Sequence, residues 1–446
     1  MSDRAADPMI TTPERNWSGT YTYRAQEIHR PRTIAELQRL IGSSRSSLHA
    51  LGTRHSFNDI SDAAGLISLE SLPGEVIINE NAATVTVPAG MRYGDLARRL
   101  QESGWALRNL PSLPHISAAG SVATATHGSG NDNQSLSSAV TSMSMIAGTG
   151  DQVGIDHSSA DFAGVVVQLG ALGVVTELTL AIEPTFDVRQ DVYEHLQWDQ
   201  LTGSFEEVMG AGYSVSAITD FAGGNVDMLW VKSRLIDGEP ATMPAELFGA
   251  RAATEKLHVT RGNDPLHCTP QLGEPGPWHE RLPHFLLEFT PSSGAEIQSE
   301  YLMDRRYAGP AIDALRELGH LIAPLVRSAE IRTVAADELW LSSAYQRNVF
   351  GVHFTWQPDV AAVAAVVPKI EAALQRFQPR PHWAKVFGPA YDFAELYPRL
   401  ADFRRLAATY DPRGVFRTPF LERTILGRLS PELVEGRSST GSDRIC

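Results

Sequence analysis

The sequence predicts a protein of mixed helices and strands that folds as two domains. Its 446 residues are more than one ordinary hydrophobic core accommodates. Before Glu183-Pro184, short predicted strands alternate with amphipathic helices, whereas after this dipeptide the aromatic content rises and longer strands are expected. We therefore place a domain boundary at Glu183-Pro184.

The first domain is predicted to begin with a helix and then to alternate strands with turns. Thr33-Ile-Ala-Glu36 has the spacing of a capping box, and apolar residues at helical spacing follow it through Ile41. Thr and Val alternate over Thr84–Val87, as in a half-buried strand. The other predicted elements are strands at Leu48–Leu51, Leu66–Leu69, Val76–Ile78 and Ser142–Ala147, a helix at Tyr93–Leu100 and a loop at Ala118–Gly130.

The second domain is predicted to combine longer strands with two helices. The strands are expected at Met228–Lys232, Phe285–Phe289 and Val352–Trp356, and the helices at Ala311–Ala323 and Val360–Phe377. The Pro- and Gly-rich region 235–283 is predicted to form surface loops, and the polar tail from Ser430 is predicted to be disordered.

Composition and charge limit the classes of partner. A formal net charge of −14 argues against binding to nucleic acid or to an anionic membrane. Cys268 and Cys446 are the only cysteines, which excludes a disulfide framework and a thiolate metal cluster. The N-terminus lacks the apolar core of a signal peptide and no apolar run reaches the length of a membrane span, so a cytoplasmic protein is expected. No association motif is visible, and a monomer is expected.

Two segments rich in small residues point to a large phosphorylated cofactor. From Ala118 to Gly130, all residues except Val122 and His127 are Gly, Ala, Ser or Thr. Small side chains let backbone N–H groups approach a ligand closely, and successive N–H groups bind phosphate. A second turn, Gly52-Thr-Arg-His-Ser-Phe57, carries a histidine. The pair favours a diphosphate cofactor held at two points, although the longer segment alone is equally consistent with a tightly packed turn.

The usual nucleotide and metal motifs are missing from the sequence. It contains neither a Gly-x-Gly-x-x-Gly fingerprint nor a Walker loop. His279-Glu-Arg-Leu-Pro-His284 resembles a zinc-protease helix, but it is one residue too long and Pro283 would break the helix. No metal site is predicted.

Pairs of polar residues on predicted strands suggest a site for a polyhydroxylated substrate. Residues i and i+2 of a strand share a face, which places Glu330 beside Arg332 and His353 beside Thr355. His382-Trp-Ala-Lys385 adds an imidazole and an ammonium group. Such groups suit a ligand bound by many hydrogen bonds, and the alternative is a set of ion pairs between strands.

Taken together, the motifs resemble a known family. The sequence is similar to vanillyl-alcohol-oxidase-type flavoproteins, in their sugar-alcohol and aldonolactone oxidase branch. The resemblance covers roughly residues 16–425 and is carried by Gly52-Thr-Arg-His-Ser-Phe-Asn58, Ser112-Leu-Pro-His-Ile-Ser117, Gly120-Ser-Val-Ala-Thr124, Thr126-His-Gly128, Gly170-Ala-Leu-Gly-Val-Val-Thr176, Glu330-Ile-Arg-Thr-Val-Ala-Ala-Asp337 and Arg380-Pro-His-Trp-Ala-Lys385. Two positions depart from the pattern, because Arg54 and Ala125 stand where glycine is common.

The resemblance implies an α+β, two-domain FAD-binding fold of the PCMH type, with a substrate domain built on an antiparallel sheet flanked by helices. The implied divisions are an FAD-binding domain at 12–184, a substrate-binding domain at 185–385, a C-terminal return to the FAD domain at 386–428 and a disordered tail at 429–446. It also implies FAD attached covalently through His55. The implied cofactor-binding residues are Gly52, Thr53, Arg54, His55, Ser56, Ser112, Ser117, Gly120, Ser121, Val122, Ala123, His127, Gly173, Val175 and His382.

The resemblance further implies an activity and the residues that carry it. The expected reaction is FAD-dependent oxidation of the C1 primary alcohol of alditols such as xylitol and sorbitol to the aldose, with O2 reduced to H2O2. Ser112, Glu330, Arg332, His353, Thr355 and Lys385 are expected to bind substrate, with Arg332, Lys385 and Glu330 as the catalytic set. An aldonolactone oxidase or dehydrogenase, and a flavin- or sugar-binding protein without turnover, are the alternatives.

Overall fold

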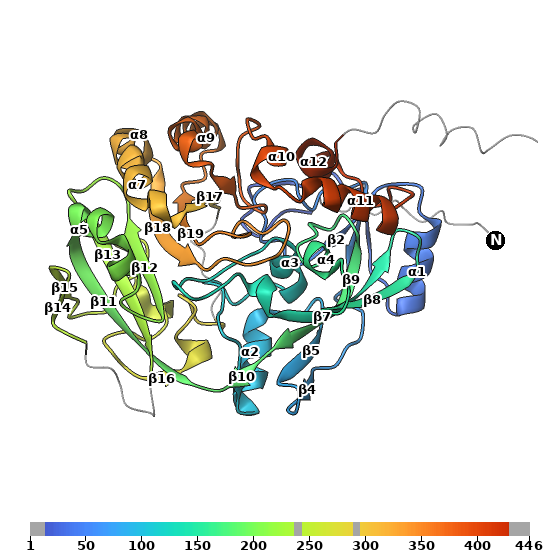
Figure 1. The fold of residues 1–446 in the computed structure, drawn as a ribbon, viewed down its shortest axis with the longest axis horizontal. Coiled ribbons are helices and arrows are strands. Elements are labelled where there is room, and N and C mark those ends of the chain that lie inside the picture. Colours follow the sequence, from blue (N-terminus) through green and yellow to red (C-terminus); the bar gives the residue numbers. More distant parts are fainter. Residues whose placement is uncertain (1–13, 236–242, 289–294, 428–446) are drawn as a thin grey trace, which may run out of the picture.

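The fold is described from a computed structural model for residues 14–235, 243–288 and 295–427. Two large antiparallel sheets lie side by side, one formed by the first half of the chain and one by the second (Figure 1). The predicted tail at 429–446 lies outside the described residues, as do the first 13 residues.

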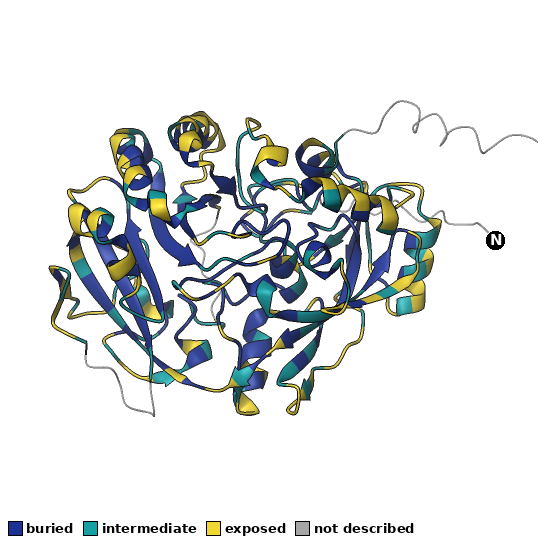
Figure 2. Ribbon diagram, viewed as in Figure 1, coloured by how far each residue is buried: buried dark blue, intermediate teal, exposed yellow. Residues whose placement is uncertain are grey.

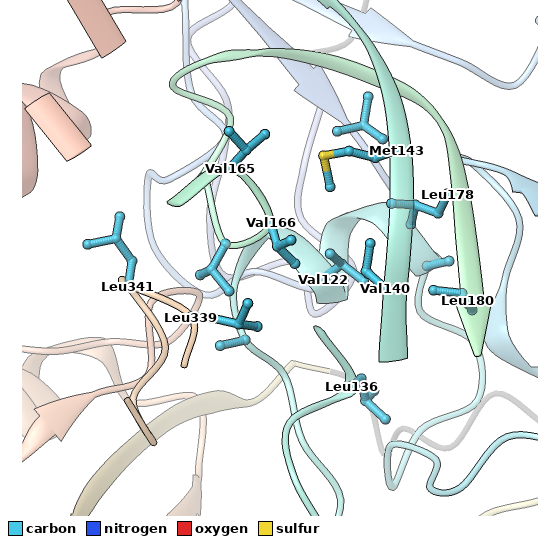
Figure 3. Close-up of a cluster of buried hydrophobic side chains, with 14 of the residues drawn as sticks. Val122, Leu136, Val140, Met143, Val165, Val166, Leu178, Leu180, Leu339 and Leu341 are labelled. Atoms are coloured by element: carbon cyan, nitrogen blue, oxygen red, sulfur yellow. The ribbon is translucent and has the colours of Figure 1, made fainter. Parts of the chain in front are cut away.

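The first sheet has five antiparallel strands in the order β4-β5-β9-β7-β8. Its strands are β4 (Ile77–Asn79), β5 (Thr84–Pro88), β9 (Gly173–Ala181), β7 (Val140–Ala147) and β8 (Gln152–Asp156). The helices α2 (Tyr93–Glu102) and α3 (Ala118–Ala123) contribute to the same hydrophobic core. Figure 3 shows part of this core, where Val122 of α3 lies among Val140, Met143, Leu178 and Leu180 of the sheet.

A small parallel sheet and the C-terminal residues complete this half of the molecule. The sheet has the order β1-β3-β2 and is formed by β1 (Glu27–His29), β3 (Gly65–Ser68) and β2 (Leu48–Leu51), with α1 (Ile34–Ser43) preceding β2. The C-terminal helices are α10 (Phe393–Leu396), α11 (Leu400–Tyr410) and α12 (Pro419–Leu421). Val415 and Phe416 pack in one cluster with Leu37 and Ile41 of α1, so the segment around residue 415 returns to the N-terminal half.

The second sheet is larger and has ten strands. Its order is β14-β15-β11-β13-β12-β18-β19-β17-β20, and β16 pairs with β11. The strands are β11 (Asp187–Gln197), β12 (Ser214–Thr219), β13 (Asn225–Arg234), β14 (Glu246–Leu247), β15 (Ala250–Ala252), β16 (Gly276–Pro277), β17 (Ile297–Asp304), β18 (Val326–Val334), β19 (Val349–Trp356) and β20 (Arg380–Pro381).

Alternation along the central strands gives this sheet two different faces. Ile331, Val352 and Phe354 lie in a hydrophobic cluster with residues of the helices. Those helices are α5 (Trp198–Gly203), α6 (Phe205–Met209), α7 (Ala308–Glu317), α8 (Gly319–Ile322) and α9 (Val360–Leu374). The helices expose their outer surfaces while the strands beneath are buried (Figure 2). The opposite face carries the polar residues that the intervening positions supply.

The structure differs from the sequence prediction at four places. Within the predicted surface loops at 235–283, the described residues also contribute the short strands β14, β15 and β16 to the large sheet. Residues Ala118–Ala123 form a helix inside the predicted loop, because small residues also allow a tight helical turn against the sheet. The predicted helix at 311–323 is divided into α7 and α8 around Leu318. At the predicted strand Phe285–Phe289, only an isolated bridge from Phe285 to Cys268 forms within the described residues.

Short elements complete the fold: β6 (Trp105–Ala106), paired with β10 (Glu183–Pro184), and α4 (Phe162–Val165).

Candidate active site

A cavity of about 780 Å³ lies between the two halves of the molecule. It is lined by both glycine-rich segments and by the polar face of the ten-stranded sheet. Of the site residues predicted from the sequence, those on its wall are Gly52, Thr53, Arg54, His55, Ser56, Ser112, Ser117, Gly120, Ser121, Ala123, His127, Gly173, Val175, Glu330, Arg332, His353, Thr355, His382 and Lys385.

Val122 is the one predicted site residue that does not line this cavity. Its side chain is 2% exposed and packs in the hydrophobic core of the first half of the chain (Figure 3). Helical geometry turns Val122 to the sheet while Ser121 and Ala123, its neighbours in α3, reach the cavity wall. Its side chain therefore serves packing.

The first glycine turn presents a buried imidazole to the cavity. His55 Nδ1 lies 3.1 Å from Thr53 Oγ1, and the ring stacks on Trp17 with centroids 4.9 Å apart. His55 Nε2 is buried and has no hydrogen-bond partner in the described structure. Burial lowers the pKa of His55 to about 4, so the ring is neutral near pH 7 and keeps an unprotonated nitrogen.

Two glycines hold the cavity open at Ser117. A Cβ atom at Gly52 would lie 2.6 Å from Ser117 Oγ, and one at Gly120 would lie 2.8 Å from the same oxygen. Thr53 Oγ1 accepts a hydrogen bond from the Ser117 amide at 3.1 Å, which joins the two segments. The backbone is thus exposed to a ligand at both segments. The cradle, the cavity volume and the unpartnered His55 nitrogen all fit a bulky cofactor such as FAD.

Positive φ angles occur at both positions where glycine was expected. The φ angle is 63° at Arg54 and 52° at Ala125, which is the left-handed region that glycine adopts without strain. The Arg54 side chain forms an ion pair with Glu14 at 3.3 Å. The departures from the family pattern therefore retain the backbone conformation of a glycine turn.

The polar face of the large sheet holds a buried charge network centred on Glu300. Glu300 Oε1 accepts a hydrogen bond from Arg332 Nη2 at 2.6 Å, and Oε2 accepts one from Lys385 Nζ at 2.6 Å. His127 Nε2 lies 3.3 Å from Oε1. The Glu300 side chain is 1% exposed, so the carboxylate, guanidinium and ammonium groups compensate one another away from water.

Strand register explains why these side chains meet. Glu330 of β18 and Glu300 of β17 are both paired with His353 of β19, so the three residues form one row across the sheet. Thr355 lies two residues further along β19, and its Oγ1 is 3.2 Å from His353 Nε2. Lys385 reaches the same row from beyond β20 and contacts His353 Nδ1 at 2.6 Å.

The electrostatics keep most of this network charged. Burial by itself raises the pKa of Glu300, but the neighbouring Lys385 and Arg332 hold it well below the usual range. Burial likewise raises the pKa of Glu330, but Arg332 and His284 hold it well below the usual range. Burial lowers the pKa of Arg332, but Glu330 and Glu300 outweigh it and raise the value. Burial, followed by Lys385, lowers the pKa of His353 to about 4, so this ring is neutral at neutral pH.

Ser112 and His382 link the network to the cofactor-facing loops. Arg332 Nη1 donates a hydrogen bond to Ser112 Oγ at 3.4 Å. The His382 and His127 rings lie 6.1 Å apart, and His382 Nδ1 accepts from the Ala384 amide at 3.2 Å. Burial and then Lys385 lower the pKa of His382 well below its usual value. The predicted substrate and cofactor groups therefore share one continuous cavity wall.

Three residues of this site were not identified from the sequence. Glu300 is the centre of the charge network, His284 lies 2.8 Å from Glu330 Oε1, and Lys232 lies 3.3 Å from His284 Nδ1. The available signal was a carboxylate, Glu300, directly before the apolar run Tyr301-Leu-Met303. His284 lies in no helix or strand, and its sequence neighbours gave no indication that it contacts Glu330.

Comparison with known proteins agrees with the geometry. A family model described as "FAD binding domain" matches residues 25–156, and one described as "D-arabinono-1,4-lactone oxidase" matches residues 296–424. The chain is 46% identical over 422 residues to an alditol oxidase from Streptomyces sp. (strain IKD472 / FERM P-14339), covering 94% of this chain and all of the relative. It is 25% identical to an L-gulono-1,4-lactone dehydrogenase from Mycobacterium tuberculosis, covering 92% of this chain and 98% of the relative.

A solved structure supports the fold independently. Cholesterol oxidase from B. sterolicum superimposes with a TM-score of 0.75 at 15% identity, covering 95% of this chain and all of that chain. The fold and the cavity define an FAD-binding α+β protein of the PCMH type. The chain belongs to the vanillyl-alcohol-oxidase-type flavoprotein family, in the branch that contains alditol oxidase and the aldonolactone oxidases. No helix in the described part of the chain is long and apolar enough to cross a membrane.

Proposed function

We infer that the protein oxidises the C1 primary alcohol of alditols such as xylitol and sorbitol to the aldose, with FAD as cofactor and O2 as the final acceptor, releasing H2O2. The observation that carries this inference is the buried pair of cations, Arg332 and Lys385, held by Glu300 in the cavity that both glycine segments line. The 46% identity to an alditol oxidase over nearly the whole chain supports the substrate class.

The charge network explains how the chain would activate an alcohol. FAD, when bound, supplies a hydride acceptor that O2 can reoxidise. Arg332 and Lys385 stabilise alkoxide character on the C1 oxygen, which lowers the barrier to loss of hydride from the same carbon. Because Glu300 fixes both cations before substrate arrives, little reorganisation is needed when negative charge develops.

The surrounding polar groups suit a substrate with several hydroxyl groups. Ser112, Glu330, His353 and Thr355 supply donors and acceptors along the cavity wall. A substrate that lacks the matching hydroxyl groups would leave these buried groups without partners, and it would be rejected for that reason. One chain supplies all of these groups, which supports a monomer as the active unit.

The remaining predicted residues are proposed to hold FAD. The neutral ring of His55, whose Nε2 has no partner among the described residues, favours this residue as the covalent attachment point of the flavin. Ser117, Gly120, Ser121, Ala123 and His127 are assigned to the diphosphate and the ring edge, Gly173 and Val175 to the adenine side, and His382 to the flavin. Acid precipitation tests the link: colour should remain with wild-type protein and leave His55→Ala, and acid-stable colour in the variant would contradict the assignment.

An aldonolactone oxidase or dehydrogenase is the second candidate, favoured by the match of residues 296–424 to an arabinonolactone oxidase model. A peroxide assay under air with xylitol, sorbitol and a γ-lactone distinguishes the two. We expect peroxide from the polyols, and its production from the lactone alone would favour the second candidate. Anaerobic xylitol should also bleach the flavin, which a binding protein without turnover would not show.

A further inference from the structure

A hydrogen-bonded chain lies behind Glu330, on the side away from Glu300. Lys232 Nζ of β13 lies 3.3 Å from His284 Nδ1, and His284 Nε2 lies 2.8 Å from Glu330 Oε1. Lys232, His284 and Glu330 are 2%, 5% and 9% exposed, so water does not compete strongly for these bonds. The mechanism above uses only the last of the three.

Lys232 fixes the segment that carries His284. Its ammonium group also donates to the carbonyl oxygens of Leu282 at 2.5 Å and Pro283 at 2.9 Å. An ammonium group has three donors and no acceptor, so its three partners satisfy it completely. The Trp230 ring packs edge-on against the His284 ring with centroids 5.1 Å apart, which fixes the plane of the imidazole.

This arrangement determines which nitrogen of His284 carries the proton. Burial lowers the pKa of His284, so its ring is neutral and has a single N–H group. Because the Lys232 ammonium can only donate to Nδ1, the proton must be on Nε2, where it donates to Glu330 Oε1. The Ser216 hydroxyl also bonds to Glu330, and Arg332 Nε lies 3.7 Å from its Oε2.

His284 also supports a second substrate-facing residue. Its backbone amide donates to the carbonyl oxygen of Ser112 at 3.0 Å. One residue therefore contacts both Glu330 and Ser112, which come from segments more than 200 positions apart in the sequence. Movement of the segment containing residues 282–284 would displace both.

We propose that Lys232 and His284 are positioning residues that hold Glu330, and through the backbone Ser112, in the orientation that binds the hydroxyl groups of the polyol. This inference rests on the proposed function for its substrate. Burial lowers the pKa of Lys232 to about 7, although the negative charge of Glu330 acts in the opposite direction. Burial also raises the pKa of Cys268 to about 12, so its thiol is neutral in this range. The titratable or charged groups that face Lys232 and His284 are Glu330, Cys268 and, on the far side of the His284 ring, Arg332. As pH rises through the pKa of Lys232, this side chain loses its charge and one of the three N–H donors that its partners require, and KM for the polyol should rise.

Four variants separate positioning from simple packing. Per bound flavin, His284→Leu and Lys232→Met should each lower kcat/KM for xylitol by about 10- to 100-fold, mainly through KM. His284→Leu removes the charge-assisted bond to Glu330, whereas Lys232→Met removes the bonds that hold residues 282–284. His284→Gln, whose amide can replace the Nε2 donor, should stay within about threefold of wild type. Cys268→Ala disturbs the same cluster without removing a bond of the chain, and it should leave KM unchanged. An unchanged KM in His284→Leu, or an equal loss in His284→Gln, would overturn the proposal.

A measurement without substrate keeps the proposal separate from the enzymatic function. In ¹⁵N-histidine-labelled wild-type protein, the His284 signal, identified by its absence in His284→Gln, should be that of the neutral Nε2–H tautomer. In Lys232→Met the Glu330 carboxylate, which can only accept, should retain the Nε2–H tautomer, while the Nδ1 signal should shift because its donor is gone. If wild type produces no peroxide from any polyol, the proposed function fails while this spectrum still tests the chain. A neutral Nδ1–H tautomer in wild type would contradict the positioning role even in a fully active enzyme.

Discussion

The two walls of the cavity are built in opposite ways. The wall proposed to hold the cofactor, hereafter the cofactor wall, uses backbone and small side chains from two short segments, around Gly52 and around Gly120. The wall proposed to bind substrate, hereafter the substrate wall, uses long charged side chains from separate parts of the chain, where Glu300, Arg332 and Lys385 meet. A cradle of backbone is sensitive to added volume, whereas a buried charge network is sensitive to a lost charge.

Loss of one carboxylate should have the largest effect. Glu300→Gln leaves Arg332 and Lys385 buried without their shared counter-charge, which typically costs about 3–5 kcal/mol. We expect kcat/KM for xylitol to fall by roughly 10²- to 10³-fold, with flavin still bound, in a peroxide assay normalised to flavin absorbance. Glu371→Gln is the matched control, because Glu371 is also a buried carboxylate but belongs to α9 and does not line the cavity. It accepts hydrogen bonds from the Tyr301 hydroxyl and the Gly388 amide. A variant with normal kcat/KM would show that the cations do not need Glu300.

The second largest effect should be a fall in the free energy of unfolding in acid, caused by His353 of the substrate wall. The pKa of His353 is lowered to about 4 in the folded protein from 6.5, so folding favours the neutral ring. The associated stability is fully present above pH 6.5 and is lost as pH falls from 6.5 toward 4, by about 3 kcal/mol for this group. Denaturant unfolding at several pH values measures this slope. His353→Gln should flatten the slope over that range, and an identical slope in the variant would assign the effect elsewhere.

Added volume should disturb the cofactor wall in a different way. Gly52→Ala places a Cβ atom 2.6 Å from Ser117 Oγ, and Ser117 is also confined by Gly120. Overpacking of this kind costs about 1–3 kcal/mol, so we expect purified protein to contain less flavin while activity per bound flavin is nearly unchanged. Gly203→Ala, where nothing lies within 4 Å of the added atom, is the control. A fall in activity per flavin would place Gly52 in the substrate chemistry instead.

The smallest predicted effect is a stabilisation. Arg54 has a φ angle of 63°, so Arg54→Gly relieves backbone strain while it loses a partly exposed ion pair to Glu14. We expect a net gain of about 1 kcal/mol, seen as a small increase in Tm. Arg54→Ala removes the same ion pair but keeps the strained Cβ atom, and it should give no gain. If both variants behave alike, strain at this turn is not significant.

The cofactor wall could be predicted from the sequence to a large extent. Small residues and turns are local signals, so the segments around His55 and Ser117 were identified before any fold was known. Within them, the side chain of Val122 packs in the core and does not line the cavity, because the sequence does not say which side of a short helix faces the cavity. The strand at 84–87 and helices ending at Ile41, Leu100 and Phe377 were also predicted, because their periodicity is local. The observed helices α1, α2 and α9 end within three residues of these positions.

The substrate wall could be predicted only in part. The pairs Glu330–Arg332 and His353–Thr355 followed from strand alternation, but their common partner Glu300 did not. Register between β17, β18 and β19 places Glu300 in their row, and register depends on pairing between strands that the sequence separates. His284 was considered only as part of a metal motif, and its role depends on a loop held by Lys232.

The sequence by itself determined the class of site: two glycine-rich segments, a histidine inside the first of them and paired polar residues on strands. These are properties of neighbouring residues, and they survive without knowledge of the fold. Only the tertiary structure decided which charges compensate each other, since Coulomb interactions depend on distance in space and on exclusion of water. It therefore decided that Glu300 holds both cations, and that Lys232 and His284 lie behind Glu330.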